Sequence, residues 1–188
     1  MDNKDVLRSL KKYLASVLAD APPSEEEGGP YDVNLVRDEF MARPSAVVRA
    51  LGDVLYDGSR HTTDIVQPFE IFVYPTNGFD GGEIGNSLAA YEVQRVLANG
   101  FVVGISPGRA YRVPIWSYEG VNWDEASTGD PIGYARVDQF TAQTMVDAED
   151  DTLFTVMANF RLTWRQEGDR VGFEGDNVVS MDMTGSVE

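Results

Sequence analysis

The chain has 188 residues, with 31 acidic and 15 basic side chains that give a formal net charge of −16. It has no cysteine, which excludes disulfides, thiolate nucleophiles, iron–sulfur clusters and cysteine zinc sites. A field this negative repels phosphate backbones, so we do not expect the surface as a whole to wrap nucleic acid. We expect one domain over 1–188, with no secretory signal and no segment that spans a bilayer.

Lysine is almost absent from this chain. Its three lysines are Lys4, Lys11 and Lys12, and arginine supplies every later positive charge. Two sources fit this composition. One is a halophilic host, where high salt screens the repulsion between acids. The other is an ordinary acidic protein from a GC-rich genome, in which codon bias replaces lysine with arginine.

The first part of the chain alternates short elements with turns. Apolar residues at intervals of three and four predict an amphipathic helix over 5–18. Residues 20–30 form an exposed connector rich in proline, glutamate and glycine. Alternation over 31–35 and the apolar run 46–51 predict two strands, and 52–63 predicts a turn or loop.

A stronger strand pattern covers 65–74, where β-branched and aromatic residues dominate. Pro68 lies inside it, so we expect its first half to be a sheet edge or a bulge. A glycine-bearing loop leads into a helix predicted over 87–98, with its N-cap at 86–87 and its end at 99–100. Ile84, Leu88, Tyr91 and Arg95 mark one face of this helix, and Ala89, Val93, Val96 and Leu97 broaden its apolar side.

The next segments predict a hairpin and a loop. Residues 101–105 and 109–118 flank a turn signal at 106–108 and are expected to pair. Residues 120–133 are polar and rich in turn residues, which predicts a loop.

The most regular pattern is a pair of long strands near the end of the chain. From Phe154 to Trp164, apolar residues alternate with mostly polar ones over eleven residues, which predicts a strand with one buried face. Residues 134–146 precede it as a second strand, and the acids between them form a charged hairpin tip. Residues 170–179 predict a short peripheral strand before a mobile tail. The sum is an α+β fold: an antiparallel or mixed sheet flanked by two helices, with a long β-hairpin.

No segment carries a recognised catalytic or cofactor motif. The glycine loop 78–85 matches neither nucleotide-binding pattern, and its acids would oppose a phosphate. His61 is the only histidine and lies in a polar stretch, so we interpret it as a surface residue. The acidic tip is interpreted as edge protection, or as a face for a basic partner, in preference to a calcium site. We therefore expect no enzyme, no cofactor and no metal.

The order of segments resembles the tail terminator (tail-completion or neck) proteins of long-tailed phages and related archaeal viruses. The resemblance is carried by the N-terminal helix, the acidic connector, strand 69–74 running into the second helix, and the late strand 153–164 with its phenylalanine–arginine pair and closing tryptophan. It spans 5–166 and leaves 167–188 as a peripheral hairpin and tail. The chain departs from the family in extra residues at 120–133 and in the tail beyond Gly168.

The resemblance implies a virion protein of the neck, made in the host cytoplasm, that assembles as a homo-oligomer with six as the expected number of copies. The ring caps the tail tube protein and meets the head–tail connector or stopper, while DNA passes through its lumen without specific binding and no membrane is involved. The interface residues expected on this basis are Phe140, Asp147, Glu149, Asp150, Asp151, Phe154 and Trp123.

Two alternatives remain open. One is another ring component of the neck or tail tube. The other is a cytosolic accessory domain that binds a small ligand or protein, with Trp116, Tyr118 and Trp123 lining its pocket.

Overall fold

The computed structural model describes residues 3–22, 31–35, 43–52, 55–58, 62–75, 82–102, 112–118, 129–146 and 153–167. Within them, two helices and one sheet confirm the expected α+β class. The elements are α1 (Asn3–Leu18), β1 (Asp32–Asn34), β2 (Ser45–Ala50), β3 (Leu55–Gly58), β4 (Thr62–Tyr74), α2 (Gly82–Phe101), β5 (Arg112–Ile115), β6 (Gly133–Val146) and β7 (Phe154–Glu167). Neither helix in these segments is long and apolar enough to cross a membrane.

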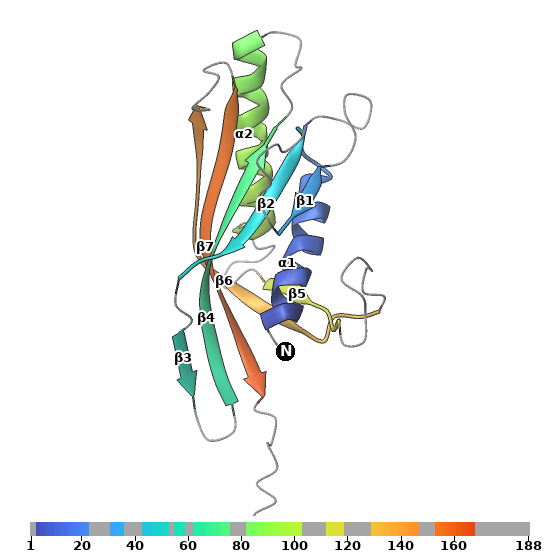
Figure 1. Cartoon of the computed structure of the whole chain (residues 1–188), viewed down its shortest axis with the longest axis vertical. Coiled ribbons are helices and arrows are strands. Elements are labelled where there is room, and N and C mark those ends of the chain that lie inside the picture. Colours follow the sequence, from blue (N-terminus) through green and yellow to red (C-terminus); the bar gives the residue numbers. More distant parts are fainter. Residues whose placement is uncertain are drawn as a thin grey trace, which may run out of the picture.

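The sheet is mixed and is built around three long strands (Figure 1). Its strand order is β1-β2-β4-β7-β6-β5. β3 pairs with the first half of β4, along the edge whose second half pairs with β2. β1 and β2 are parallel, and every other pair is antiparallel. The predicted hairpin is confirmed, since β6 pairs with β7 from Arg136 opposite Thr163 to Val146 opposite Phe154.

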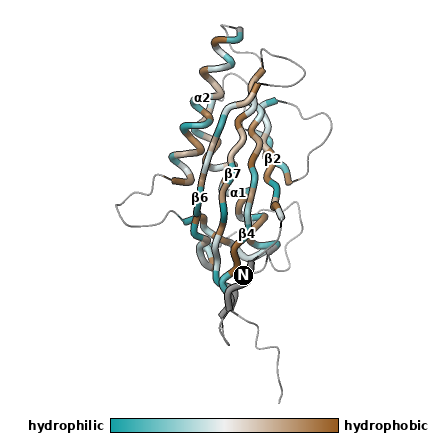
Figure 2. Tube along the Cα trace, turned by 90° about the vertical axis from the view of Figure 1, so that its left-hand side faces the viewer, coloured by the Kyte–Doolittle hydropathy of each residue, from teal (hydrophilic) through white to brown (hydrophobic). Residues whose placement is uncertain are grey.

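Both helices cover the same face of the sheet. α1 packs on β1, β2 and β5, and α2 packs on β6 and β7. In Figure 2 the sheet lies in front of α1, and α2 runs along the β6 side. The predicted alternation of β7 is confirmed, because its residues that face the helices are buried: Val156, Ala158, Phe160, Leu162 and Trp164.

The sequence predicted that Pro68 marks a sheet edge or a bulge. In the structure Pro68 does not lie at a sheet edge. The first half of β4 pairs with β3 on one side and β7 on the other. The Leu51 amide donates a hydrogen bond of 2.9 Å to the Pro68 carbonyl, so the backbone polar groups of Pro68 face the point where β2 ends and β3 begins. The N–H that proline lacks falls in this gap and costs no ladder bond.

The prediction of a loop over 52–63 was wrong at β3. This strand has only four residues, and two of them are Asp57 and Gly58, which are depleted in strands. Its pairing with β4 sets its conformation, and nothing in its own composition marks it.

α2 is longer at both ends than the sequence predicted. It begins at Gly82, so Asn86 lies inside the helix and is buried. It also runs through Gly100. This glycine faces α1, and a Cβ at its position would lie 2.6 Å from Cγ1 of Val17, so the helix contact requires a residue without a side chain. The Tyr13 hydroxyl donates a 2.5 Å hydrogen bond to the Gly100 carbonyl at the same contact.

Phe101 ends α2 and does not begin a strand. Its ring meets Tyr13 edge-on at 5.3 Å, stacks on Phe140 at 5.6 Å and lies 5.0 Å from Phe160. The predicted strand at 101–105 was therefore wrong at its start, where Phe101 belongs to the end of α2 and Val102 to the turn that follows it. β5 pairs with β6, and residues 103–111 lie outside the described residues.

We predict that Gly100→Ala destabilises the protein. Alanine is the better helix former, but its methyl group collides with the stiff, β-branched Val17, and overpacking of this kind costs about 1–3 kcal/mol. Chemical denaturation measures the free energy of unfolding. Adding Val17→Ala to Gly100→Ala should recover stability relative to the sum of the two single changes. Purely additive effects would contradict this account of the helix contact.

Candidate functional site

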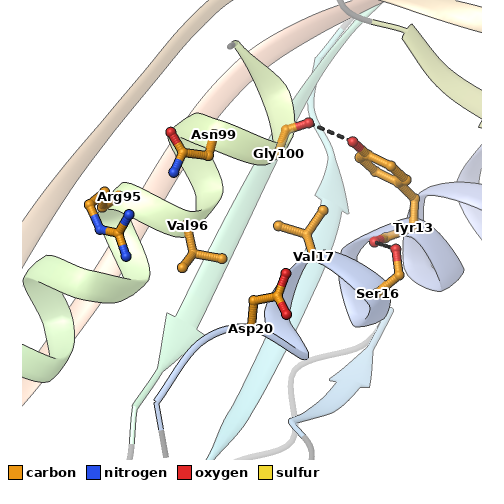
Figure 3. A pocket seen from close by; sticks show the side chains of 8 residues that line it. All are labelled: Tyr13, Ser16, Val17, Asp20, Arg95, Val96, Asn99 and Gly100. Atoms are coloured by element: carbon orange, nitrogen blue, oxygen red, sulfur yellow. Dashed lines mark hydrogen bonds between the residues drawn. The ribbon is translucent and has the colours of Figure 1, made fainter. Parts of the chain in front are cut away.

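A hollow between α1 and α2 has a volume of about 500 Å³ (Figure 3). It is lined by Tyr13, Ser16, Val17, Asp20, Arg95, Val96, Asn99 and Gly100. Its hydroxyl groups are engaged, since Tyr13 donates to Gly100 and Ser16 donates to the Tyr13 carbonyl at 2.7 Å. The hollow therefore presents no nucleophile activated by a base and is the outer edge of a helix contact.

The described residues bring no metal-binding group together. Among them, no three histidine, cysteine, aspartate or glutamate side chains are close enough to share an ion. His61 lies outside the described residues, and so does the acidic hairpin tip.

Trp116 and Tyr118 lie against α1. The Lys12 ammonium lies 4.0 Å from the centre of the Trp116 ring, and the Arg8 guanidinium lies 4.0 Å from that of Tyr118. Burial raises the pKa of the Tyr118 hydroxyl. Two hydrogen bonds of 2.9 Å fix the segment: the Trp116 amide donates to the Ser9 hydroxyl, and the Tyr118 amide donates to the Asp5 carboxylate. These rings anchor the N-terminal helix, and the proposed pocket partner Trp123 lies outside the described residues.

The outward face of α2 is apolar. Ile84, Leu88 and Tyr91 follow one another at helical spacing and are 74%, 62% and 61% exposed. We call these three residues the α2 stripe. The sequence grouped them correctly on one face, but the sheet takes the other face, where Ala89, Ala90, Val93, Leu97 and Phe101 are buried. A helix that is apolar on two faces is expected to be buried on both.

α1 differs from α2 in the side chains that it exposes to solvent. Its buried side carries Val6, Leu10 and Leu14, whereas Lys4 and Lys11 lie on the exposed side. Its outward face carries no counterpart of the α2 stripe among the exposed large apolar residues. The contrast sets the α2 stripe apart as an exposed apolar surface, a feature that makes it the candidate interaction site among the described residues.

The second half of β6 is an open sheet edge beside α2. β5 pairs only with residues 133–136, so residues 137–146 have β7 on one side and no strand on the other within the described structure. Gln94 of α2 partly covers this edge. Its amide donates to the Ala142 carbonyl at 2.9 Å and accepts from the Thr144 hydroxyl at 3.2 Å.

A β-bulge interrupts the same strand. The register of β6 against β7 shifts between Asp138 and Thr141, and Gln139 adopts a positive φ of 54°. A bulge of this kind bends an edge strand and blunts it against uncontrolled pairing.

The structure separates the interface residues predicted from the sequence. Phe140 is half-buried, stacks on Phe101 and packs against the core, so it serves the monomer's own fold. Phe154 also packs partly on the core, and its carbonyl accepts a 3.0 Å hydrogen bond from Arg43. Asp147, Glu149, Asp150, Asp151 and Trp123 lie outside the described residues.

The sequence analysis did not single out the α2 stripe as a candidate interface. The available signal for such a surface was that α2 is apolar on two faces. The sequence does not say which of the two faces the sheet covers.

The sequence matches no model of a known protein family and no curated protein.

We predict opposite effects of two glycine substitutions on β6. Gln139→Gly removes the strain of a positive φ, which costs an ordinary residue about 1–2 kcal/mol, and should raise the free energy of unfolding. Gln143→Gly, at an exposed position of the same strand, should lower it by about 0.5–1 kcal/mol. Thermal and denaturant unfolding of the two variants test this, and equal loss of stability in both would contradict a strained bulge.

Proposed function

We propose that this chain is a structural virion protein of the tail-terminator kind. In this proposal its copies form a ring, with six as the expected number, that caps the tail tube and joins it to the head-side connector. The proposal assigns no reaction to the chain.

The layout of the chain supports the proposal. The resemblance calls for an N-terminal helix, a central strand running towards a second helix, and a late long strand paired in a hairpin. α1, β4, α2 and the β6–β7 hairpin follow in that order. This agreement concerns the order and kind of elements, and many α+β proteins share parts of it.

The single observation that carries the proposal is the α2 stripe. Full burial of an aliphatic or aromatic side chain contributes about 1.5–3 kcal/mol, so covering the remaining surface of the stripe is worth a few kcal/mol. Association of two proteins costs about 4–15 kcal/mol of translational and rotational freedom. The stripe alone therefore supports a weak pairwise contact.

A ring resolves this shortfall. Each copy of a closed ring makes two contacts, and the copy that closes the ring makes both at once. The open edge of β6 lies beside the stripe and offers backbone groups that a neighbouring chain can pair with. Assembly of this kind is steeply dependent on protein concentration and leaves a soluble monomer when dilute.

The chain's acidity fits the same proposal. The described residues hold 11 of the 31 acidic side chains and 11 of the 15 basic ones, so the net charge of −16 falls on the remaining segments. The helices and the sheet are thus neutral on balance and do not repel one another across a ring contact. The acidic segments repel DNA wherever they face the lumen.

We predict that the protein forms a ring of defined size whose assembly needs the α2 stripe. Light scattering on a size-exclusion column, run at low salt and in molar salt, should show an oligomer at high protein concentration in at least one of the two. Leu88→Gln with Tyr91→Gln should shift the protein to monomer, because glutamine keeps the helix but removes the apolar surface.

The matched control is Ala15→Gln on the exposed side of α1. It should assemble as the unchanged protein does, and all three proteins should melt alike as dilute monomers, since the changed side chains are exposed. A wild-type protein that stays monomeric at high concentration in both low and molar salt would refute the proposal.

A second prediction separates a terminator from other ring components. Added to growing tail tubes, a terminator stops elongation and appears by electron microscopy at one end of each tube only. A tube subunit would instead extend the tubes along their length, and a cytosolic accessory domain would bind neither end.

A further inference from the structure

The face of the sheet opposite the helices carries a cluster of arginines. Arg112 and Arg136 lie directly opposite each other on β5 and β6, and Arg161 lies opposite Asp138 on the neighbouring pair of strands. Residues paired across strands project on the same face, so the three guanidinium groups share one area. We call Arg112, Arg136 and Arg161 the arginine patch.

The positive charges of the patch outnumber the acidic side chains beside them. Asp138 is the one acidic side chain that the described parts of β5, β6 and β7 bring between these arginines, and it accepts hydrogen bonds of 3.0 Å from both Arg136 and Thr163. Asp64 on β4 also interacts electrostatically with Arg136. The nearby Arg165 is already paired with Asp64 at 2.8 Å, which lowers the pKa of that carboxyl. Arg112 and Arg161 are exposed and make no ion pair with the described residues. Like charges directly opposite on a sheet are destabilising, so the site favours an added carboxylate.

The densest acidic segment of the chain is the hairpin tip, where Asp147, Glu149, Asp150 and Asp151 fall within five residues. This tip cannot reach the patch of its own molecule. Arg161 lies eight residues along β7 from Leu153, which at about 3.3 Å per residue is roughly 26 Å. Any span of six residues that starts after Val146 and returns to Leu153 can extend back along the hairpin by about 10 Å at most, whatever its conformation.

We infer that the arginine patch of one copy is the docking surface for the acidic hairpin tip of a second copy. This rests on the proposed function, because it names how neighbours in the ring recognise one another. The contact joins two different surfaces, the end of one hairpin and the sheet face of the next copy. A head-to-tail contact of this kind closes into a ring when its rotation divides a full turn. Arginine suits the role because its planar group binds carboxylates through paired hydrogen bonds.

The test reverses charge on each side of the contact. The patch variant carries Arg112→Glu and Arg161→Glu, and the tip variant carries Asp147→Lys and Asp150→Lys. Self-association is measured by sedimentation at low salt. Each variant alone should weaken association at least about tenfold, and the two sets combined in one chain should restore it to within a few-fold of the unchanged protein.

The change in net charge separates a specific contact from general repulsion between chains. The tip variant is four charges less negative than the unchanged chain, so a mere reduction of repulsion would strengthen its association, whereas loss of a specific contact weakens it. Lys4→Glu with Lys11→Glu, on the exposed side of α1, makes the chain as negative as the patch variant and serves as its control. It should weaken association less than the patch variant does.

Failure of this inference is distinguishable from failure of the proposed function. An oligomer that persists in the tip variant, or that strengthens in it, overturns the inference and leaves the ring standing. So does loss of association in the patch variant with no recovery in the combined variant, which would mean that another acidic segment or another protein occupies the patch. A chain that never associates refutes both.

Discussion

The contact of α2 with the β6–β7 hairpin determines which surface of this protein is left open. Phe101 stacks on Phe140 and lies against Phe160, while Gln94 ties the middle of the helix to the edge of β6. These contacts fix the rotation of α2 about its own axis. Because the alanine and valine face of the helix packs on the sheet, the α2 stripe faces outward.

Charge is distributed as unevenly as apolar surface. The helices and strands are neutral on balance, and the acidity falls on the segments around them. In the proposed ring, this neutral framework packs against copies of itself, while the acidic segments keep dilute chains apart. The arginine patch is the local exception on the sheet, and in our inference it is the surface that one of those acidic segments of a second copy recognises.

Periodicity predicted much of the fold and little of the surface. β4, β6, β7 and α1 were predicted close to their observed bounds, because long runs of period two or period 3.6 reflect burial directly. The C-terminal end of α2 was missed because Gly100, normally a helix terminator, is required by the approach of Val17. β3 and the pairing of β5 were missed because contacts distant in sequence decide them. The α2 stripe was visible as a pattern, but its outward direction depends on the aromatic contacts of Phe101.

The most direct measurement uses the absence of cysteine from the chain. A single Leu88→Cys change places one thiol in the middle of the α2 stripe, and Ala15→Cys places one on the exposed side of α1. The account predicts that the rate of thiol labelling at 88 falls as protein concentration rises through the range of assembly, while the rate at 15 stays constant. A rate at position 88 that is unaffected by assembly would contradict the claim that another copy covers this face of the helix.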